Sequence, residues 1–115
     1  MARLLEIRTY NLKPGTRAEF HRIATQIVLP MLDRHPMDVV AIKPSLVEEN
    51  SYVLMRAYAD AADRAASQGS FYGGAAWKEG PRASVLACIE SYATVVIEAS
   101  EATIDGLRDR PPKLP

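Results

Sequence analysis

The hydrophobic pattern of the chain changes between the two-residue period of a strand and the 3.6-residue period of a helix in a fixed order. Apolar and polar residues alternate over residues 4–11, and a helical pattern follows from residue 16 to residue 35. Two segments rich in β-branched residues, 38–45 and 51–59, flank the short polar sequence VEENS and predict an antiparallel hairpin. A second helical region begins after Asp60, and residues 89–99 indicate a last strand.

This order of elements predicts the fold class. Strand, helix, strand, strand, helix, strand is the order of the ferredoxin-like α+β fold, whose four-stranded antiparallel sheet carries its helices on one face. Pro30 cannot donate a backbone hydrogen bond, so it is expected to kink or end the first helix. After residue 99 the periodicity is lost. We therefore expect a domain over residues 1–99 and a tail over residues 100–115 that is disordered or packed on a partner.

The composition limits the partners that the chain can have. A length of 115 residues suits one domain, and 14 basic against 14 acidic residues give no electrostatic attraction to nucleic acid or to an acidic membrane. No apolar run approaches the about 20 residues of a membrane span, and the first residues do not have the pattern of a signal peptide. Cys88 is the single cysteine and is expected to be buried. We therefore predict a cytoplasmic protein without a disulfide.

A repeated motif marks one face of the predicted sheet. Arg and Tyr stand two residues apart in Arg8-Thr9-Tyr10 and again in Arg56-Ala57-Tyr58, so that both members of each pair point to the same face. Glutamates and a further tyrosine fall on that face in the first and last strands. We call this surface the mixed face, and it is expected to contain Glu6, Arg8, Tyr10, Arg56, Tyr58, Glu90 and Tyr92.

The mixed face is expected to be the side of the sheet that the helices leave bare. The opposite face carries apolar residues such as Leu5, Ile7 and Met55, which suit packing against the helices. A face of tyrosines and paired charges is typical of an interface between two copies of one chain. We therefore predict a homodimer in which a second copy covers the mixed face and the arginines pair with Glu6 and Glu90.

The mixed face is also a candidate ligand site. Arg8 and Arg56 can bind a carboxylate through bidentate hydrogen bonds, while Tyr10, Tyr58 and Tyr92 offer hydroxyls and ring faces. The alternative is an ion-pair lattice in which the two arginines and the two glutamates neutralise each other and no ligand is needed.

A second candidate site lies between the sheet and the helices, near the irregular segment FYGGAAWKEGPR. Tyr72 and Trp77 supply apolar walls there and Arg82 a polar contact, although Trp77 could equally anchor a short helix to the core. His35 and Tyr72 are the candidate catalytic residues, and His35 could instead cap the carbonyls at the end of the first helix. Two separated histidines without a Cys or Asp cluster do not predict a metal site.

Three segments carry a family resemblance: LLEIRTYNLKPGTRAEF, LPMLDRH and FYGGAAWKEGPR. The phrase E-x-R-x-Y-x-L-x-P-G, from Glu6 to Gly15, and the segment Ala76-Trp77-Lys78 are its most specific parts. Over residues 3 to about 98 the sequence resembles the NIPSNAP family. The resemblance implies a dimeric α/β barrel of the ferredoxin-like superfamily, in which the sheets of two chains pack face to face.

The resemblance leaves several functions open, since the wider superfamily includes cofactor-free monooxygenases, isomerases, haem-binding enzymes and small-molecule sensors. We expect a homodimer that binds a small, partly apolar organic molecule. The alternatives are a cofactor-free monooxygenase or isomerase, and a structural or interaction dimer without activity. The residues indicate no cofactor, although the resemblance leaves haem open, and neither nucleic acid nor a membrane is an expected partner.

Overall fold

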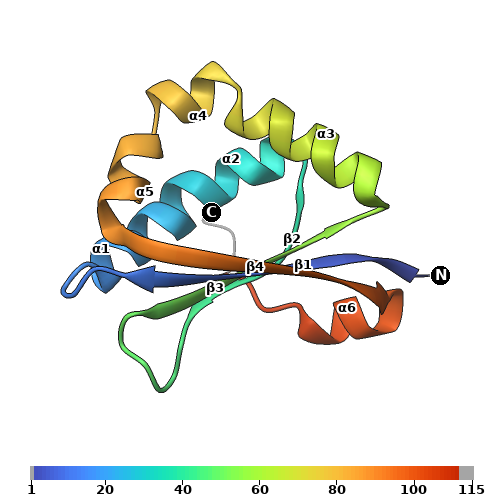
Figure 1. Ribbon diagram of the computed structural model, residues 1–115, viewed down its shortest axis with the longest axis horizontal. Helices are drawn as coiled ribbons and strands as arrows, with labels where there is room; N and C mark the ends of the chain where they lie inside the picture. Colours follow the sequence, from blue (N-terminus) through green and yellow to red (C-terminus); the bar gives the residue numbers. More distant parts are fainter. Residues whose placement is uncertain (1, 112–115) are drawn as a thin grey trace.

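The computed structural model describes residues 2–111 and has the predicted order of strands and helices (Figure 1). Four strands form one antiparallel sheet in the order β2-β3-β1-β4: β1 (Ala2–Leu12), β2 (Asp38–Pro44), β3 (Ser51–Tyr58) and β4 (Ile89–Ser100). The two long central pairings, of β1 with β3 and with β4, join segments that are far apart in the sequence. The predicted ferredoxin-like α+β fold is confirmed.

The first helical region runs without a break through three segments: α1 (Arg17–Ile23), the π-helical η1 (Ala24–Val28) and α2 (Leu29–Arg34). The sequence predicted that Pro30 would kink or end this helix, but the helix continues past it. Because Pro30 has no amide hydrogen to donate to the preceding turn, that turn widens. The amide of Leu29 donates to the carbonyl of Ala24, five residues earlier, which is the π-helical pattern.

The second helical region consists of α3 (Ala61–Tyr72) and two short helices, α4 (Ala75–Glu79) and α5 (Arg82–Cys88). The side chain of Asp60 caps α3 by accepting a hydrogen bond of 2.8 Å from the amide of Asp63. Gly80 ends α4, and a Cβ atom at this position would overlap the carbonyl oxygen of Ala76. Within residues 2–111, no helix is both long enough and apolar enough to cross a bilayer.

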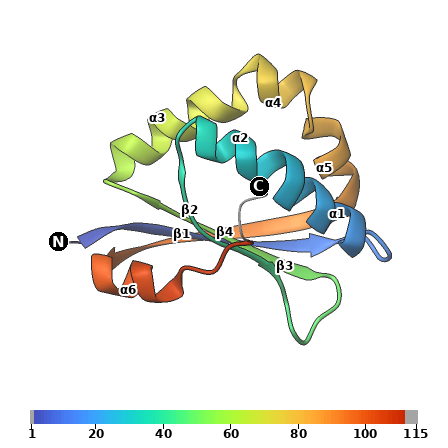
Figure 2. The ribbon, with the colours of Figure 1, turned by 180° about the vertical axis from the view of Figure 1, so that it is seen from behind.

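Part of the segment that the sequence predicted as a tail forms a further helix, α6 (Glu101–Leu107). It begins with a side-chain cap at Ser100 and lies on the face of the sheet opposite the other helices (Figures 1 and 2). Ile104 anchors α6, since its side chain is fully buried in a cluster with Leu5, Val40 and Ala57. The last part of the predicted tail, residues 112–115, lies outside the described residues.

The prediction of which sheet face the helices cover is wrong. Helices α1–α5 cover the mixed face, and Glu6 and Arg56 are fully buried beneath them. Phe20 of α1 packs there against Tyr10 and Tyr52, with ring centroids 5.2 and 4.9 Å apart. The physical reason lies in α3, which supplies polar side chains that satisfy the buried charges of this face.

The centre of the opposite face is apolar, while Arg3 and Lys43 on the same face pair with Asp38 and Asp109. Helix α6 covers only one end of this face. Register places Ile7 opposite Met55 on β3 and opposite Val95 on β4, so these three side chains share that face. Val95 is 58% exposed and the neighbouring Ile97 is 44% exposed. We call this surface the bare face and define it by Ile7, Val53, Met55, Val95 and Ile97.

Candidate functional site

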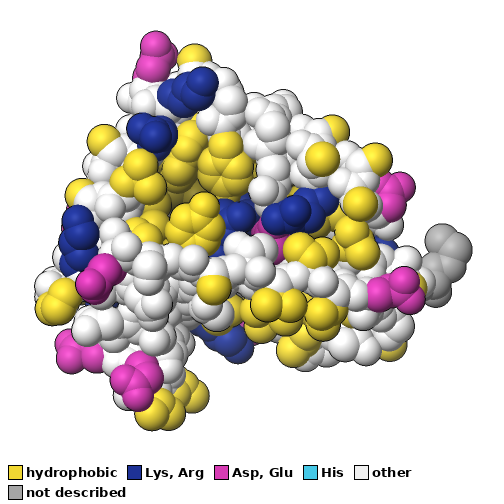
Figure 3. Space-filling model, in the orientation of Figure 1, with side chains coloured by type: hydrophobic (Ala, Val, Ile, Leu, Met, Phe, Trp, Pro, Cys, Tyr) yellow, Lys and Arg dark blue, Asp and Glu magenta, His cyan; other side chains and the backbone are white. Residues whose placement is uncertain are grey.

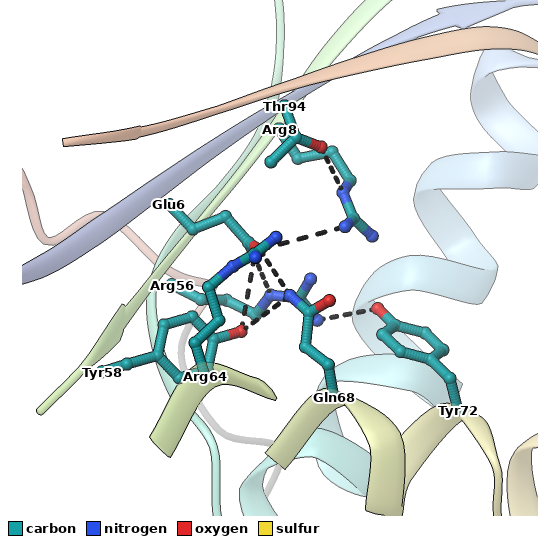
Figure 4. A network of polar contacts seen from close by, with 8 residues as sticks. All are labelled: Glu6, Arg8, Arg56, Tyr58, Arg64, Gln68, Tyr72 and Thr94. Carbon is teal, nitrogen blue, oxygen red and sulfur yellow. Dashed lines mark hydrogen bonds and ion pairs between the residues drawn. The ribbon is translucent and has the colours of Figure 1, made fainter. Parts of the chain in front are cut away.

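The buried carboxylate of Glu6 is the centre of a polar cluster between the sheet and α3 (Figure 4). Arg56 on β3 donates from Nε to one oxygen of Glu6 at 2.7 Å, and Arg64 on α3 donates from Nε to the other at 2.8 Å. The Nη2 atom of Arg8 lies 3.9 Å from the same carboxylate. Among the described residues, Glu6 is the one acidic side chain within ion-pair distance of these three arginines. The cluster therefore combines three positive charges with one negative charge.

Neutral groups complete the Glu6 cluster. The hydroxyl of Tyr58 donates to Glu6 over 3.4 Å, and the side-chain amide of Gln68 donates to the other carboxylate oxygen. Arg56 also donates from Nη1 to the hydroxyl of Tyr72 at 2.7 Å. Its remaining nitrogen, Nη2, is buried and has no hydrogen-bond partner among residues 2–111. Glu6 is thus saturated with donors while Arg56 retains a free one.

The spacing of polar residues in α3 explains why this helix faces the cluster. Arg64, Gln68 and Tyr72 stand four residues apart, so they lie on one side of the helix. All three point toward the sheet in Figure 4. Arg64 and Gln68 were not predicted from the sequence. A polar stripe at this spacing in an Ala-rich helix is the signal that could have identified them.

Several ionisable groups of the site have shifted pKa values, among them Glu6 and Tyr10. Burial disfavours ionisation of Glu6, but the charge of Arg56 and the hydrogen bonds from Arg56 and Arg64 outweigh it, so the pKa of Glu6 lies below its ordinary value. Burial raises the pKa of Tyr10 to about 12. At neutral pH the site therefore contains an ionised carboxylate and a protonated phenol.

A pocket of about 260 Å³ opens beside this cluster, between the sheet and helices α3 to α5. In Figure 3, hydrophobic side chains surround a hollow between the helical layer and the sheet, and basic side chains lie next to them. Arg8 reaches the pocket from β1 and donates from Nε to the hydroxyl of Thr94 at 3.1 Å. Its guanidinium lies over the ring of Tyr92, 5.1 Å from the centroid. We call this cavity the sheet–helix pocket.

The structure joins the two candidate sites of the sequence analysis into one. Arg56 and Tyr58 lie in the Glu6 cluster beside the pocket and do not line it, whereas the other predicted ligand-binding residues do: Arg8, Tyr10, Tyr72, Trp77, Arg82 and Tyr92. Glu90, in contrast, is exposed and makes no ion pair with Arg8 or Arg56 in the described part of the chain. The predicted balance of two arginines by two glutamates is therefore wrong. The sequence analysis also missed the lining residues Gln68, Val85, Leu86 and Ile89.

The histidines lie outside the sheet–helix pocket. His35 lines a separate hollow of about 330 Å³ on the other side of Trp77, where its ring packs edge-on against Phe71. His21 pairs through Nδ1 with the hydroxyl of Tyr52 at 2.7 Å. His35 therefore does not fit the role of a base or haem ligand in the pocket, whereas Tyr72 does line it. Residues 2–111 contain no cluster of His, Cys, Asp and Glu side chains that could hold a metal ion.

The geometry defines a ferredoxin-like α+β protein with a partly open pocket between its sheet and its helices. The NIPSNAP family model matches residues 5–99, and the chain belongs to the NIPSNAP family. A comparison with curated proteins found no match.

Solved structures share this fold. An uncharacterized NIPSNAP domain protein from Burkholderia xenovorans is 24% identical with a TM-score of 0.74, over 85% of this chain and 95% of that one. A NIPSNAP family protein from Agrobacterium tumefaciens is 16% identical with a TM-score of 0.75, over 86% and 94%. A protein from Bordetella bronchiseptica, proposed to be an antibiotic biosynthesis monooxygenase, is 20% identical with a TM-score of 0.65, over 88% and 98%. At these identities the likeness shows the fold alone.

Substitution of Glu6 tests the Glu6 cluster. We expect Glu6→Gln to lower the free energy of unfolding by about 3–5 kcal/mol, because it leaves buried guanidinium groups without a counter-charge. The matched control is Glu90→Gln, which removes an exposed carboxylate from the same sheet and should change stability by less than about 0.5 kcal/mol. Urea denaturation followed by circular dichroism measures both. Equal effects of the two substitutions would contradict the assignment of Glu6 as the counter-charge.

Proposed function

We propose that the protein is a homodimer that binds a small, partly apolar organic molecule in the sheet–helix pocket. The observation that carries this proposal is the composition of the pocket, where aromatic and aliphatic walls meet a nearly buried guanidinium. Small-molecule sites typically combine an apolar lining with a few polar groups that fix the orientation of the ligand. A cavity of about 260 Å³ suits a ligand of roughly one ring with a short substituent.

Trp77 supports the proposal because it has two roles. It packs against Phe71 and Tyr72, with ring centroids 5.7 and 5.2 Å apart, and so anchors α4 to α3. The same side chain also lines the pocket. A rigid aromatic wall of this kind offers a preformed surface to an apolar ligand and limits the entropy lost on binding.

The positions and the protonation states of the candidate catalytic groups favour binding over catalysis. Among the residues considered for catalysis, His35 lies in a different hollow, and the Tyr72 hydroxyl is occupied by a hydrogen bond from Arg56. Tyr10 stays protonated at neutral pH because its pKa is about 12. Cofactor-free oxygenation or isomerisation is the alternative function, supported by the fold shared with proteins proposed to be monooxygenases.

The bare face supports the homodimer. Its neighbouring apolar side chains, of which Val95 and Ile97 are exposed and the others half-buried, form the kind of patch that a protein buries against a partner. A twofold axis would bring the same surface of both chains into contact, which is the commonest arrangement in soluble dimers.

We also assign the protein to the cytoplasm, since its single cysteine, Cys88, is buried and needs no oxidising compartment.

Ligand binding can be followed directly through Trp77, which is the single tryptophan of the chain. We expect its fluorescence, excited at a wavelength that tyrosine does not absorb, to respond saturably to phenylacetate, phenylacetamide or 3-phenylpropionate. Leu86→Tyr should weaken this response at least about tenfold, because a larger side chain at this lining position narrows the pocket. Leu107→Tyr on α6 is the matched control, at 38% exposure against 44% for Leu86, and should leave binding unchanged.

The proposal of a ligand-binding function fails if no probe gives a saturable response and native mass spectrometry of the purified protein detects no bound small molecule. That pair of results would leave a structural or interaction dimer as the function.

The dimer is tested by its mass in solution. We expect sedimentation equilibrium at micromolar concentration to give twice the 12.7 kDa mass of the chain. Val95→Lys should shift the protein to monomer, because it buries an unpaired charge at the centre of the proposed interface. Val47→Lys, in the exposed loop between β2 and β3, is the control and should remain dimeric. A wild-type monomer would contradict the proposed interface.

A further inference from the structure

The buried charges beside the sheet–helix pocket do not balance. We propose that the ligand is an organic monocarboxylate, whose carboxylate group is bound by Arg8 and whose apolar part lies against Trp77 and Val85. This inference rests on the proposed function and specifies the chemical class of the ligand.

The first support is that Arg8 lacks an acceptor for its terminal nitrogens. Its side chain is only 12% exposed, and its one hydrogen bond within residues 2–111 runs from Nε to Thr94. The nearest carboxylate, that of Glu6, lies 3.9 Å away and is already bound by Arg56 and Arg64 at 2.7 and 2.8 Å. Because Arg8 lines the pocket, its terminal donors are available to an anion bound there, and a charge-assisted hydrogen bond to a carboxylate is stronger than one to water.

The second support is the charge count of the buried groups. Arg64 is 30% exposed, so water screens its charge, whereas Arg56 and Glu6 are fully buried. Arg8 and Arg56 against Glu6 leave two positive charges and one negative charge, a surplus of one. Within residues 2–111, the buried Nη2 of Arg56 also lacks a hydrogen-bond acceptor. One negative charge bound in the pocket would neutralise the surplus positive charge.

The geometry of Arg8 favours a carboxylate as the source of that charge. Its guanidinium is held over the ring of Tyr92 and fixed at Nε by Thr94, so the terminal nitrogens are oriented as a fork. A planar fork matches the two oxygens of a carboxylate and can bind both. In Figure 4 this end of Arg8 lies on the same side of Glu6 as Tyr72, and both side chains line the pocket.

The apolar walls indicate where the rest of the ligand lies. The sheet–helix pocket shares four lining residues with a small inner cavity of about 30 Å³ between α1–η1 and the sheet: Tyr10, Tyr72, Trp77 and Val85. The inner cavity therefore lies directly behind the apolar wall that Trp77 and Val85 form, on the side of the pocket nearest the core. A ligand with its carboxylate at Arg8 would place its apolar part in this direction.

A matched pair of probes tests the proposal. Phenylacetate and phenylacetamide have nearly the same size and shape and differ in charge. At pH 7 and low salt, we expect Trp77 fluorescence titrations to show the acid binding wild-type protein at least about tenfold more tightly than the amide. Arg8→Met should remove this preference, because it takes away the guanidinium that distinguishes the charged acid from the neutral amide. Arg22→Met is the control variant, since Arg22 is an exposed side chain on α1 that pairs with Glu19, and it should keep the preference.

The outcomes separate this inference from the proposed function. If wild-type protein binds acid and amide equally, or if Arg8→Met keeps the preference for the acid, the carboxylate proposal is overturned while ligand binding stands. If neither probe binds wild-type protein, the pocket is not a site for ligands of this class and the carboxylate proposal falls as well. The comparison on wild-type protein decides the matter even if Arg8→Met does not fold.

Discussion

The ion pair between Glu6 and Arg56 is the interaction on which the rest of this structure depends. The two residues are directly opposite each other on the central strands β1 and β3, and both side chains are fully buried. A buried pair is stable only if its geometry is good and its remaining hydrogen-bonding groups are satisfied. The residues of α3 meet that condition for the carboxylate, so the pair determines which face of the sheet α3 covers.

The consequences of this pair differ for its two members. Glu6 accepts hydrogen bonds from Arg56, Arg64, Gln68 and Tyr58, which hold it ionised. In the described part of the chain, Arg56 retains a buried donor without a partner, and the terminal nitrogens of the neighbouring Arg8 make no hydrogen bond where this side chain lines the pocket. The same cluster that fixes the fold thus leaves positive charge beside a partly apolar cavity. On the opposite face the arginine and lysine side chains of Arg3 and Lys43 each pair with an aspartate, so no comparable surplus arises there, and the apolar centre of that face suits a second copy of the chain.

The sequence predicted the order of the elements and the family, because periodicity and the phrase from Glu6 to Gly15 are local signals. It also predicted that Arg8, Tyr10, Arg56 and Tyr58 share a face, since side chains in a strand alternate. It could not predict which face the helices cover. Both faces contain enough apolar residues to pack against helices, so the choice depends on the long-range partners that only the folded chain brings together.

The same limit explains the other errors. Glu90 was predicted to balance the charge of the arginines because it stands two residues from Tyr92 and was expected on the same face of the sheet. No sequence pattern shows that Arg64 and Gln68 approach Glu6 from another element. The continuation of the first helix past Pro30 depends on a π-helical turn, which has no reliable sequence signal. Conversely, the pocket residues Tyr72, Trp77 and Arg82 were predictable, because a Trp-containing segment between glycines interrupts an otherwise regular helical region.

The most direct measurement is the titration of the Glu6 carboxyl carbon by NMR, with the resonance assigned from Glu6→Gln. If Glu6 is held ionised by the surrounding guanidinium groups, the midpoint of its titration lies below the ordinary value of 4.5. A titration midpoint at or above 4.5 would show that burial outweighs the arginines. That result would contradict the central role of the cluster in the fold and in the pocket.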